Sequence, residues 1–361
     1  MRVALLTHNV DGGLVHYLSQ LANALASRVE LVVIAPEGLD PSGFPFGPGV
    51  RIRRLPVGNV VRTFAVNTLL FWRPFAFIAA VQSERPDILH FNGASLWYAL
   101  LLPLLSRRFP VVVTIHDVSP HTGSRAWDQE LARRLFLRYA DAAFVHGEWA
   151  RRQLDAPIPV YPIPHGDYSF FTESAVESRG AAEDTVLFFG RIEEYKGLQY
   201  LLEAMPLVWD VLPGTRLVIA GSGDLAPYRD QLGDGRIEVQ NRFIDDKEVP
   251  DFFARARLVV LPYVEGTQTG IIPIAYAFRL PVVVTDVGSI PEVVEEGRTG
   301  HIVPPRDPRA LADAILKLLQ NEPLRASMGT AAHEKMTREL SWGPISERAV
   351  AVYREVLEHA R

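Results

Sequence analysis

The feature that most constrains the fold is a regular alternation of short β-branched runs with longer helical patterns. In the first half of the chain we predict strands at 3–8, 30–36, 51–57, 87–91, 111–117 and 142–147. The second half repeats the arrangement with TVLFFGR, RLVIAGSG, RIEVQNRF, RLVVLPY and PVVVTDVG. Continuous apolar strands separated by helices indicate parallel sheets that are covered on both faces. Because the pattern runs twice, we predict an α/β protein with two doubly wound, Rossmann-like domains.

The length also favours two domains, because 361 residues exceed what one ordinary core holds. Four prolines stiffen the segment 155–171, and we expect the chain to cross between the domains there. The spacing of Ile345, Ala349, Val352 and Val356 predicts an amphipathic last helix that packs back onto the first domain. The predicted domains are 1–160, completed by a helix at about 343–361, and 161–342.

Several kinds of site have no counterpart in the sequence. The absence of cysteine excludes a disulfide framework and a thiolate metal site. The chain has no G-x-x-x-x-G-K-[ST] loop, no H-E-x-x-H, no D-x-D pair and no G-x-S-x-G, and AGSGDLA carries only a lone G-x-G. We therefore expect chemistry that needs neither a covalent serine nor a metal. The apolar run in MRVALLTHNV is too short for a signal peptide, and the 13 residues of ASLWYALLLPLLS are too few to cross a bilayer.

Polar side chains follow many of the predicted strands. They are His8, Asn9, Asn92, His116, Asp117, His146, His165, Arg191, Ser222 and Glu265. In doubly wound sheets, ligands bind beyond the carboxyl ends of the strands, where the N-termini of helices also point. We therefore expect these side chains to line a polar cleft between the two domains.

Arg191 and Lys196 stand where a predicted strand ends and a helix begins. The planar guanidinium of arginine matches phosphate oxygens, and the lysine adds a mobile point charge. The alternative is that both cations form surface ion pairs with Glu193 and Glu194. The residues alone leave an anion site and a solvated surface equally open.

A set of motifs resembles the family 4 glycosyltransferases, which are retaining, metal-independent enzymes of the GT-B fold. The motifs are DGGLVHYLSQLANAL, TIHDVSP, PIPHGDYSFF, FFGRIEEYKGLQYLLEAM, LVIAGSGDL and PVVVTDVGSIPEVVEEGRTGHIVPPRD. The closing SWGPISERAVAVYREVL resembles the family's crossover helix, so the resemblance covers nearly the whole chain. It implies two Rossmann-like domains that face each other across a cleft, with the acceptor in the first and the nucleotide sugar in the second.

The resemblance implies a donor-binding role for several residues. Gly12 and Gly13 match the glycine loop that approaches the donor phosphate, although a plain strand-to-helix turn is the alternative. Arg191 and Lys196 match the pair that neutralises the donor diphosphate. The full set of implied donor-binding residues is Gly12, Gly13, Arg191, Lys196, Gly221, Gly223, Thr269, Gly270 and Ile271.

The same resemblance implies two catalytic residues. His116 matches the histidine near the transferred sugar, where it would bond a hydroxyl or orient the acceptor; a histidine satisfied within the core is the alternative. Glu265 is the candidate for the sugar-facing carboxylate of the family motif. The candidates for the acceptor side or the cleft are Asn9, Asn92, Asp117 and His165.

The chain departs from the family pattern at the second glutamate of that motif. Alignment on Pro281 puts Ile274 at this position, and counting forward from Glu265 leads to Pro273. The carboxylate that grips the ribose hydroxyls in the family is therefore absent. The chain could bind ribose in another way, use a less usual donor, or have lost catalysis. We favour the first explanation because His116 and the diphosphate cations are retained.

We predict a retaining, hexosyltransferase-like enzyme that moves a sugar from a nucleoside-diphosphate sugar to a glycan, lipid-linked or small-molecule acceptor. Its role would be in cell-envelope or surface polysaccharide biosynthesis. The alternatives are a catalytically silent subunit that binds sugar nucleotides or glycans, and a sugar-nucleotide epimerase. We expect no cofactor, no metal and no nucleic-acid partner.

We expect a cytoplasmic location, with peripheral contact to the inner face of the membrane as a further option. Segments 67–81 and 94–108 are rich in aromatic or aliphatic residues and have flanking arginines. An exposed Trp72 or Phe75 there would rest in a membrane interface. The alternative, which we prefer at this point, is that both segments are ordinary core helices.

Overall fold

The computed structural model describes residues 1–57, 72–118, 126–173 and 184–359. They form two compact units. The first contains residues 1–57, 72–118, 126–166 and 341–359, and the second contains 167–173 and 184–340. The chain therefore leaves the first unit after Gly166 and returns after Leu340, where the sequence-based boundaries were 160 and 342.

The first unit is built on a seven-stranded sheet. Its strands are β1 (Arg2–Leu6), β2 (Glu30–Pro36), β3 (Arg51–Leu55), β4 (Ile88–Asn92), β5 (Val111–Ile115), β6 (Ala142–Val145) and β7 (Val160–Pro162). They lie in the order β3-β2-β1-β4-β5-β6-β7, and every pair is parallel. The strand order reverses between β1 and β4, so the carboxyl ends of these strands form the switch point where doubly wound sheets bind ligands.

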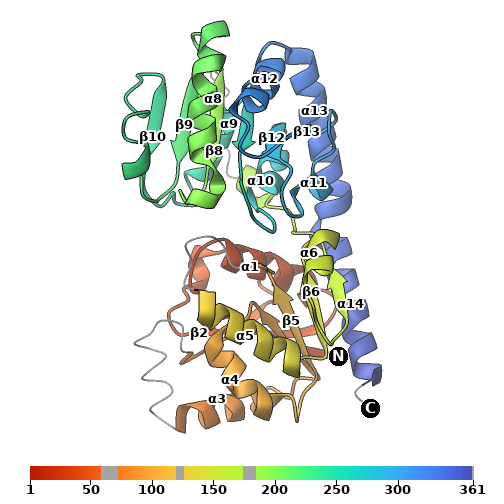
Figure 1. The fold of residues 1–361 in the computed structure, drawn as a ribbon. Helices are drawn as coiled ribbons and strands as arrows, with labels where there is room; N and C mark the ends of the chain where they lie inside the picture. The colour runs from red at the N-terminus through yellow and green to blue at the C-terminus, as the bar shows by residue number, and fades with distance from the viewer. Residues whose placement is uncertain (58–71, 119–125, 174–183, 360–361) are drawn as a thin grey trace. The chain divides into compact units, whose positions relative to one another are not determined.

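Helices cover both faces of this sheet (Figure 1). They are α1 (Gly13–Ala26), α3 (Trp72–Ser83), α4 (Leu96–Leu105), α5 (Ala126–Tyr139), α6 (Glu148–Gln153) and α14 (Trp342–His359). Helices α3, α4 and α5 share one apolar core with the sheet, and α1 and α14 share the other. The predicted return of the last helix is confirmed, because Ile345, Ala349, Val352 and Val356 are all buried against the first unit.

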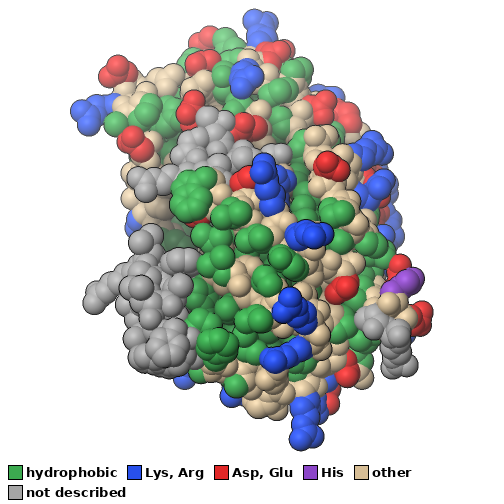
Figure 2. Space-filling view, turned by 60° about the horizontal axis from the view of Figure 1, so that its bottom comes forward, with side chains coloured by type: hydrophobic (Ala, Val, Ile, Leu, Met, Phe, Trp, Pro, Cys, Tyr) green, Lys and Arg blue, Asp and Glu red, His purple; other side chains and the backbone are tan. Residues whose placement is uncertain are grey.

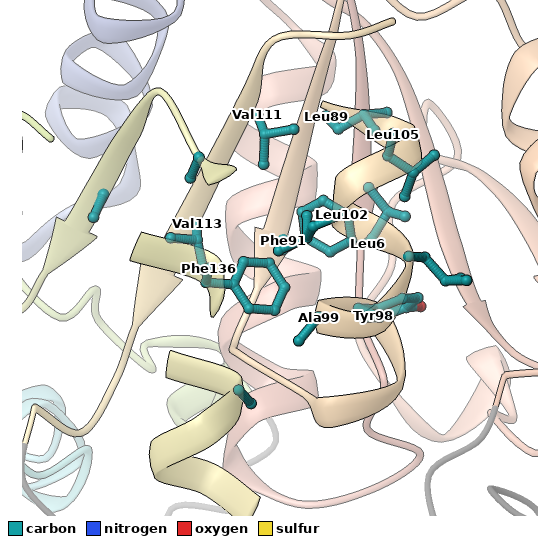
Figure 3. Packing of buried hydrophobic residues seen from close by; sticks show 14 of the residues in the cluster. Leu6, Leu89, Phe91, Tyr98, Ala99, Leu102, Leu105, Val111, Val113 and Phe136 are labelled. Atoms are coloured by element: carbon teal, nitrogen blue, oxygen red, sulfur yellow. The ribbon is translucent and has the colours of Figure 1, made fainter. Parts of the chain in front are cut away.

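Helices α3, α4 and α5 carry apolar side chains on their outer as well as their inner sides. Hydrophobic side chains gather on their outer side, with Lys and Arg side chains beside them (Figure 2). On the inner side, Phe91 of β4 packs edge-on against Tyr98 of α4 and Phe136 of α5, with ring centroids 5.1 Å away in each case (Figure 3). The inner contacts position the carboxyl end of β4, where Asn92 is the last residue.

The second unit contains a six-stranded sheet. Its strands are β8 (Thr185–Phe189), β9 (Arg216–Ala220), β10 (Ile237–Gln240), β11 (Leu258–Leu261), β12 (Val282–Thr285) and β13 (Gly300–Val303). They lie in the order β10-β9-β8-β11-β12-β13, again all parallel. The switch point falls between β8 and β11, so residues that follow these two strands lie at the expected ligand position.

Helices cover this second sheet in the same way. They are α7 (Phe170–Glu173), α8 (Leu198–Val211), α9 (Val249–Arg255), α10 (Ile271–Ala277), α11 (Ile290–Val293), α12 (Pro308–Leu319) and α13 (Glu322–Lys335). Helices α8 and α12 pack on one face, and α9 and α10 on the other. The predicted α/β class with two doubly wound sheets is therefore confirmed.

Two strands were not predicted. The segment 155–171, expected to be only an extended crossing, contributes β7 to the edge of the first sheet, so that prediction is wrong in part. Strand β7 has three residues among closely spaced prolines, which an edge strand tolerates because one side needs no ladder bonds. Strand β13 follows a turn and pairs only with β12. Within the described ranges, no helix combines the length and the apolar character that a bilayer crossing requires.

Candidate functional site

A chain of hydrogen bonds joins the carboxyl ends of β4, β5 and β6 in the first unit. Asn92 Nδ2 donates to the Leu14 carbonyl oxygen at 3.1 Å, and Asn92 Oδ1 lies 3.0 Å from His116 Nε2. His116 Nδ1 is 3.0 Å from His146 Nε2, and His146 Nδ1 is 3.3 Å from the Ile163 carbonyl oxygen. The candidates Asn92 and His116 are thus brought together, and they are joined by His146, which the sequence placed among the polar residues that follow strands.

The number of hydrogens in this chain limits the tautomers that the two histidines can adopt. The two imidazoles make three contacts that each need a hydrogen: one with the Asn92 oxygen, one with each other and one with the Ile163 carbonyl oxygen. Two neutral imidazoles carry only two N–H groups. We assign the hydrogens to the two 3.0 Å contacts, so that His146 Nε2–H donates to His116 and His116 Nε2–H donates to Asn92. An added proton would complete the third contact. Burial opposes that charge and lowers the pKa of His116 to about 3, with a smaller contribution from neighbouring histidines.

Tyr17 lies at the centre of the same cluster. Its ring meets His116, His146, His165 and Trp342 edge-on, with centroids 5.0, 5.3, 5.2 and 5.1 Å away. Burial lowers the pKa of His165 to about 4 and that of His146 well below its ordinary range. No group of three or more His, Asp or Glu side chains in the described part of the chain is arranged to hold a metal ion.

The engagement of His116 bears on its implied role. Both ring nitrogens of His116 are bonded within the protein, so a bond to a sugar hydroxyl requires one of these contacts to be exchanged. Hydrogen bonds of catalytic groups often rearrange when a substrate binds, and the role therefore stays a prediction. Asp117, the next residue, is exposed.

The glycine loop before α1 leaves room for a ligand. Gly12 caps the helix with φ +76°, a conformation that side chains disfavour, and a Cβ built on either Gly12 or Gly13 would meet no atom within 4 Å. Asn9, which is close in sequence, is half-buried. Its backbone N–H donates to the Thr7 hydroxyl. Open space therefore lies beside both glycines.

In the second unit, Lys196 is a buried cation at the carboxyl end of β8. Its residue is 8% exposed, and its Nζ lies 6.0 and 5.4 Å from the ring centroids of Tyr195 and Tyr263. A Cβ built on Gly190 would come within 2.9 Å of Nζ. Lys196 forms no ion pair with any described carboxylate. The surface pairing that the sequence left open for this residue is therefore wrong.

Two comparisons show how unusual Lys196 is. Lys335 is also buried, but its Nζ lies 2.9 Å from Glu295 and 2.6 Å from Glu339. Arg191 has a side chain that is 69% exposed and pairs with Glu193 at 3.0 Å, as the alternative expected for that residue. Of the predicted pair, the lysine thus has the features of an anion site, whereas the arginine is turned toward solvent.

Close approach of backbones explains the glycines that follow β9. A Cβ built on Gly221, whose φ is +144°, would lie 2.0 Å from the Gly190 carbonyl oxygen. A Cβ on Gly223 would lie 2.1 Å from the Ile192 carbonyl oxygen. The resemblance implies that both glycines bind the donor. The structure gives a separate reason for them, because only a residue without a side chain allows the backbone to pack this closely against the loop that carries Arg191.

The loop after β11 holds the remaining donor-side candidates. The Thr269 hydroxyl accepts a hydrogen bond from Ile271 N at 3.2 Å and lies 3.3 Å from the Tyr263 hydroxyl. Gly270 precedes the short helix α10, and Glu265 is half-buried. Ile274 is 6% exposed and belongs to the apolar core, so no polar group stands at the position of the missing glutamate.

Sequence reasoning missed the residues that shape this loop. Gly197, with φ +67°, packs so closely that a Cβ there would lie 2.0 Å from the Pro262 carbonyl oxygen. The Tyr195 carbonyl accepts a hydrogen bond from Val264 N at 2.8 Å. Tyr263 supplies the second ring beside Lys196. The glycine directly after Lys196 was the available signal, because it marks a turn that a side chain would not allow.

Comparisons with known proteins agree with this architecture. The family model described as "Glycosyl transferase 4-like domain" matches residues 12–164, and "Glycosyl transferases group 1" matches residues 183–321. The phosphatidyl-myo-inositol mannosyltransferase of Mycobacterium leprae is 28% identical over 99% of this chain and 97% of its own length.

Solved structures show the same fold. Sucrose-phosphate synthase from Thermosynechococcus elongatus has a TM-score of 0.80 at 21% identity, covering 99% of each chain. Anabaena HepE, solved in complex with UDP-glucose, has a TM-score of 0.73 at 17% identity and covers 98% of this chain and 100% of its own.

Proposed function

Because this chain belongs to the family 4 glycosyltransferases of the GT-B fold, we propose that it transfers a sugar from a nucleoside-diphosphate sugar with retention of configuration. The observation that carries the proposal is the Lys196 ammonium, buried between two tyrosines and paired with no carboxylate among the described residues. A buried charge without a partner is costly, so its presence at a sheet switch point favours an anionic ligand.

The mechanism follows from where negative charge grows during transfer. When the bond from the anomeric carbon to the diphosphate breaks, charge develops on the departing phosphate and the sugar becomes oxocarbenium-like. A preorganised ammonium in a dry site stabilises that charge without reorganising. We propose that Lys196 does this without a metal ion and that the departing phosphate accepts the proton of the acceptor hydroxyl. Attack from the same face as departure retains the configuration.

Donor and acceptor are proposed from chemistry and from similar proteins. The HepE structure contains UDP-glucose, which supports a nucleoside-diphosphate hexose as the donor class here. The M. leprae relative is named for mannosyl transfer to phosphatidyl-myo-inositol, which supports a lipid-linked or glycan acceptor. We propose that the product serves the cell envelope or a surface polysaccharide. The enzyme would then work in the cytoplasm, in peripheral contact with the inner face of the membrane.

A panel of nucleotide sugars tests the proposal, with release of nucleoside diphosphate as the readout. The variant Lys196→Met should lower the rate by about 10²–10³, the loss typical for one preorganised donor to a developing oxyanion. Lys247→Met is the matched control, because Lys247 is exposed in the same unit and should be dispensable. Arg191→Gln should cost less than Lys196→Met, because the arginine is solvated and already paired. Wild-type activity in Lys196→Met would overturn the proposal.

A further inference from the structure

The outer side of α3, α4 and α5, which we call the α3–α5 face, exposes an unusual set of large apolar side chains. They are Phe75, Leu100, Leu104, Trp127 and Leu131. Phe75 is 63% exposed and Trp127 is 69% exposed. Among the residues that the structure describes, these five make up most of the exposed large hydrophobic side chains, and all five lie on α3, α4 and α5. Single exposed apolar residues are common, but a group of this kind marks an interaction surface.

In each of the three helical segments, exposed arginines follow the exposed apolar residues, and the half-buried Arg73 is the one arginine of α3 that precedes Phe75. In α3, Phe75 near the start is followed by the exposed Arg85 just after the helix. In α4, Leu100 and Leu104 come before the exposed pair at 107–108. Helix α4 ends at Leu105, so these two arginines lie in the turn directly after its C-terminal end.

In α5 the order is the same. Trp127 and Leu131 come first, and Arg134 and Arg138 follow at the spacing of one helical stripe. The three helices share one core on one face of a parallel sheet, and helices that connect parallel strands run in a common direction. Their apolar parts therefore lie side by side, and so do their basic ends.

The basic ends have charge to offer a partner. Four exposed arginines there form no ion pair with any residue in the described ranges: Arg85, Arg107, Arg108 and Arg138. Acidic side chains near them are engaged elsewhere. Glu130 pairs with two arginines of its own helix. Asp87 accepts a hydrogen bond from Arg2 N, and Asp141 accepts one from Val111 N.

We infer that the α3–α5 face binds the surface of an anionic lipid bilayer. The apolar band would enter the headgroup and upper acyl region, with Trp127 and Phe75 as interfacial aromatics. The arginines beyond the band would contact lipid phosphates, which attract cations within a Debye length. A protein partner would need an apolar band and an acidic band in matching order, whereas an anionic bilayer supplies apolar and anionic layers in this order. The inference extends the proposed membrane contact, but it does not depend on sugar transfer.

Co-sedimentation of the full chain with vesicles tests the inference. We expect binding to vesicles of phosphatidylcholine with phosphatidylglycerol, and little binding to phosphatidylcholine alone. Raising the salt concentration should weaken binding, because screening shortens the reach of the arginines. Each of Arg107→Gln, Arg108→Gln and Arg138→Gln should weaken partitioning by about fivefold. Phe75→Ser and Trp127→Ser should each weaken it by about tenfold.

Matched controls come from the second unit. Phe243 is 62% exposed, so Phe243→Ser changes the same residue type at the same exposure and should leave binding unchanged. Arg309→Gln is the corresponding basic control, because Arg309 is also highly exposed. Equal vesicle binding in the surface variants and the controls would overturn the inference, as would no binding to anionic vesicles. Self-association that the same variants abolish, without vesicle binding, would assign the face to a second copy instead. Donor hydrolysis measured without vesicles reports separately on the proposed activity.

Discussion

Acidification should destabilise the first unit, because four of its histidines are buried as neutral imidazoles. They are His90, His116, His146 and His165. Burial lowers the pKa of His90 and His116 to about 3 and that of His165 to about 4, and it lowers the pKa of His146 well below the ordinary range. In the unfolded chain each would take up a proton near pH 6.5. The stabilisation is therefore fully present above about pH 6.5 and is lost as the pH falls toward the folded pKa values.

The size of the effect follows from proton linkage. When the pH falls from 7.0 to 5.5, protonation of one imidazole with a pKa of about 6.5 stabilises the unfolded chain by about 1.2 kcal/mol relative to a fold in which that imidazole stays neutral. Four such histidines would lower the free energy of unfolding by about 5 kcal/mol, and His8, whose pKa burial lowers to about 4, adds about 1 kcal/mol. Domains are stable by only about 5–15 kcal/mol, so the loss is large. Carboxylates contribute little in this window, since they titrate at lower pH.

Urea unfolding at a series of pH values measures this loss. The fluorescence of Trp97 and Trp149 reports on the first unit, and the ionic strength is held constant. We expect the free energy of unfolding to be flat from pH 8.5 to 7.0 and to fall steeply below pH 6.5. His165→Gln, which removes one of the five protonatable groups, should reduce the slope by about a fifth. A flat profile down to pH 5.5 would refute the reasoning, because it would mean that the imidazoles are solvated or already charged.

Three further substitutions test single contacts. Gly221→Ala should lower the free energy of unfolding of the second unit by about 3 kcal/mol or more in urea, because its Cβ would lie 2.0 Å from a carbonyl oxygen. Gly214→Ala is the control and should leave the stability unchanged, because a Cβ there meets no atom within 4 Å. Ile274→Glu should lower the melting temperature without improving donor affinity, because the new carboxylate enters an apolar core. His146→Leu removes the N–H that we assign as the donor to His116, so it should shift the pH profile of kcat. His146→Gln keeps a donor and should shift the profile less. Identical pH profiles for the two variants would contradict the assigned tautomer.

Much of the fold was predictable because parallel strands are buried on both faces. The apolar runs at β1, β5, β8 and β12, for example, follow directly from this burial. The edge strand β7 was not predictable in the same way, because its short run lies among prolines that favour an extended linker. Local patterns thus identify central strands, whereas pairing of a short edge segment depends on its neighbour.

In the candidate site, too, local patterns were predictable and contacts between distant residues were not. That polar residues follow the strands is a local property, and the structure indeed brings Asn92 and His116 together. The same pattern singled out His146, but its contact with His116 joins residues 30 positions apart, so no local pattern could predict that pairing. For both Arg191 and Lys196, the residues alone allowed either an anion site or a surface ion pair. They differ because Glu193 lies beside the arginine, whereas the turn before α8 directs the lysine toward the Tyr263 ring.

The contrast between the two buried lysines links stability to function. Lys335 is neutralised by two carboxylates, so its burial costs the fold little. Lys196 has only the faces of tyrosines beside it, and cation–π contacts of about 1–2 kcal/mol offset only part of the cost of burying an ammonium. A carboxylate in the role of Glu295 beside Lys196 would stabilise the free enzyme, but it would repel the diphosphate. Under the proposed function, the donor diphosphate supplies the negative charge that no described carboxylate provides at Lys196. An anion that binds the folded state alone raises the free energy of unfolding by about 2.7 kcal/mol at a hundredfold excess over its Kd.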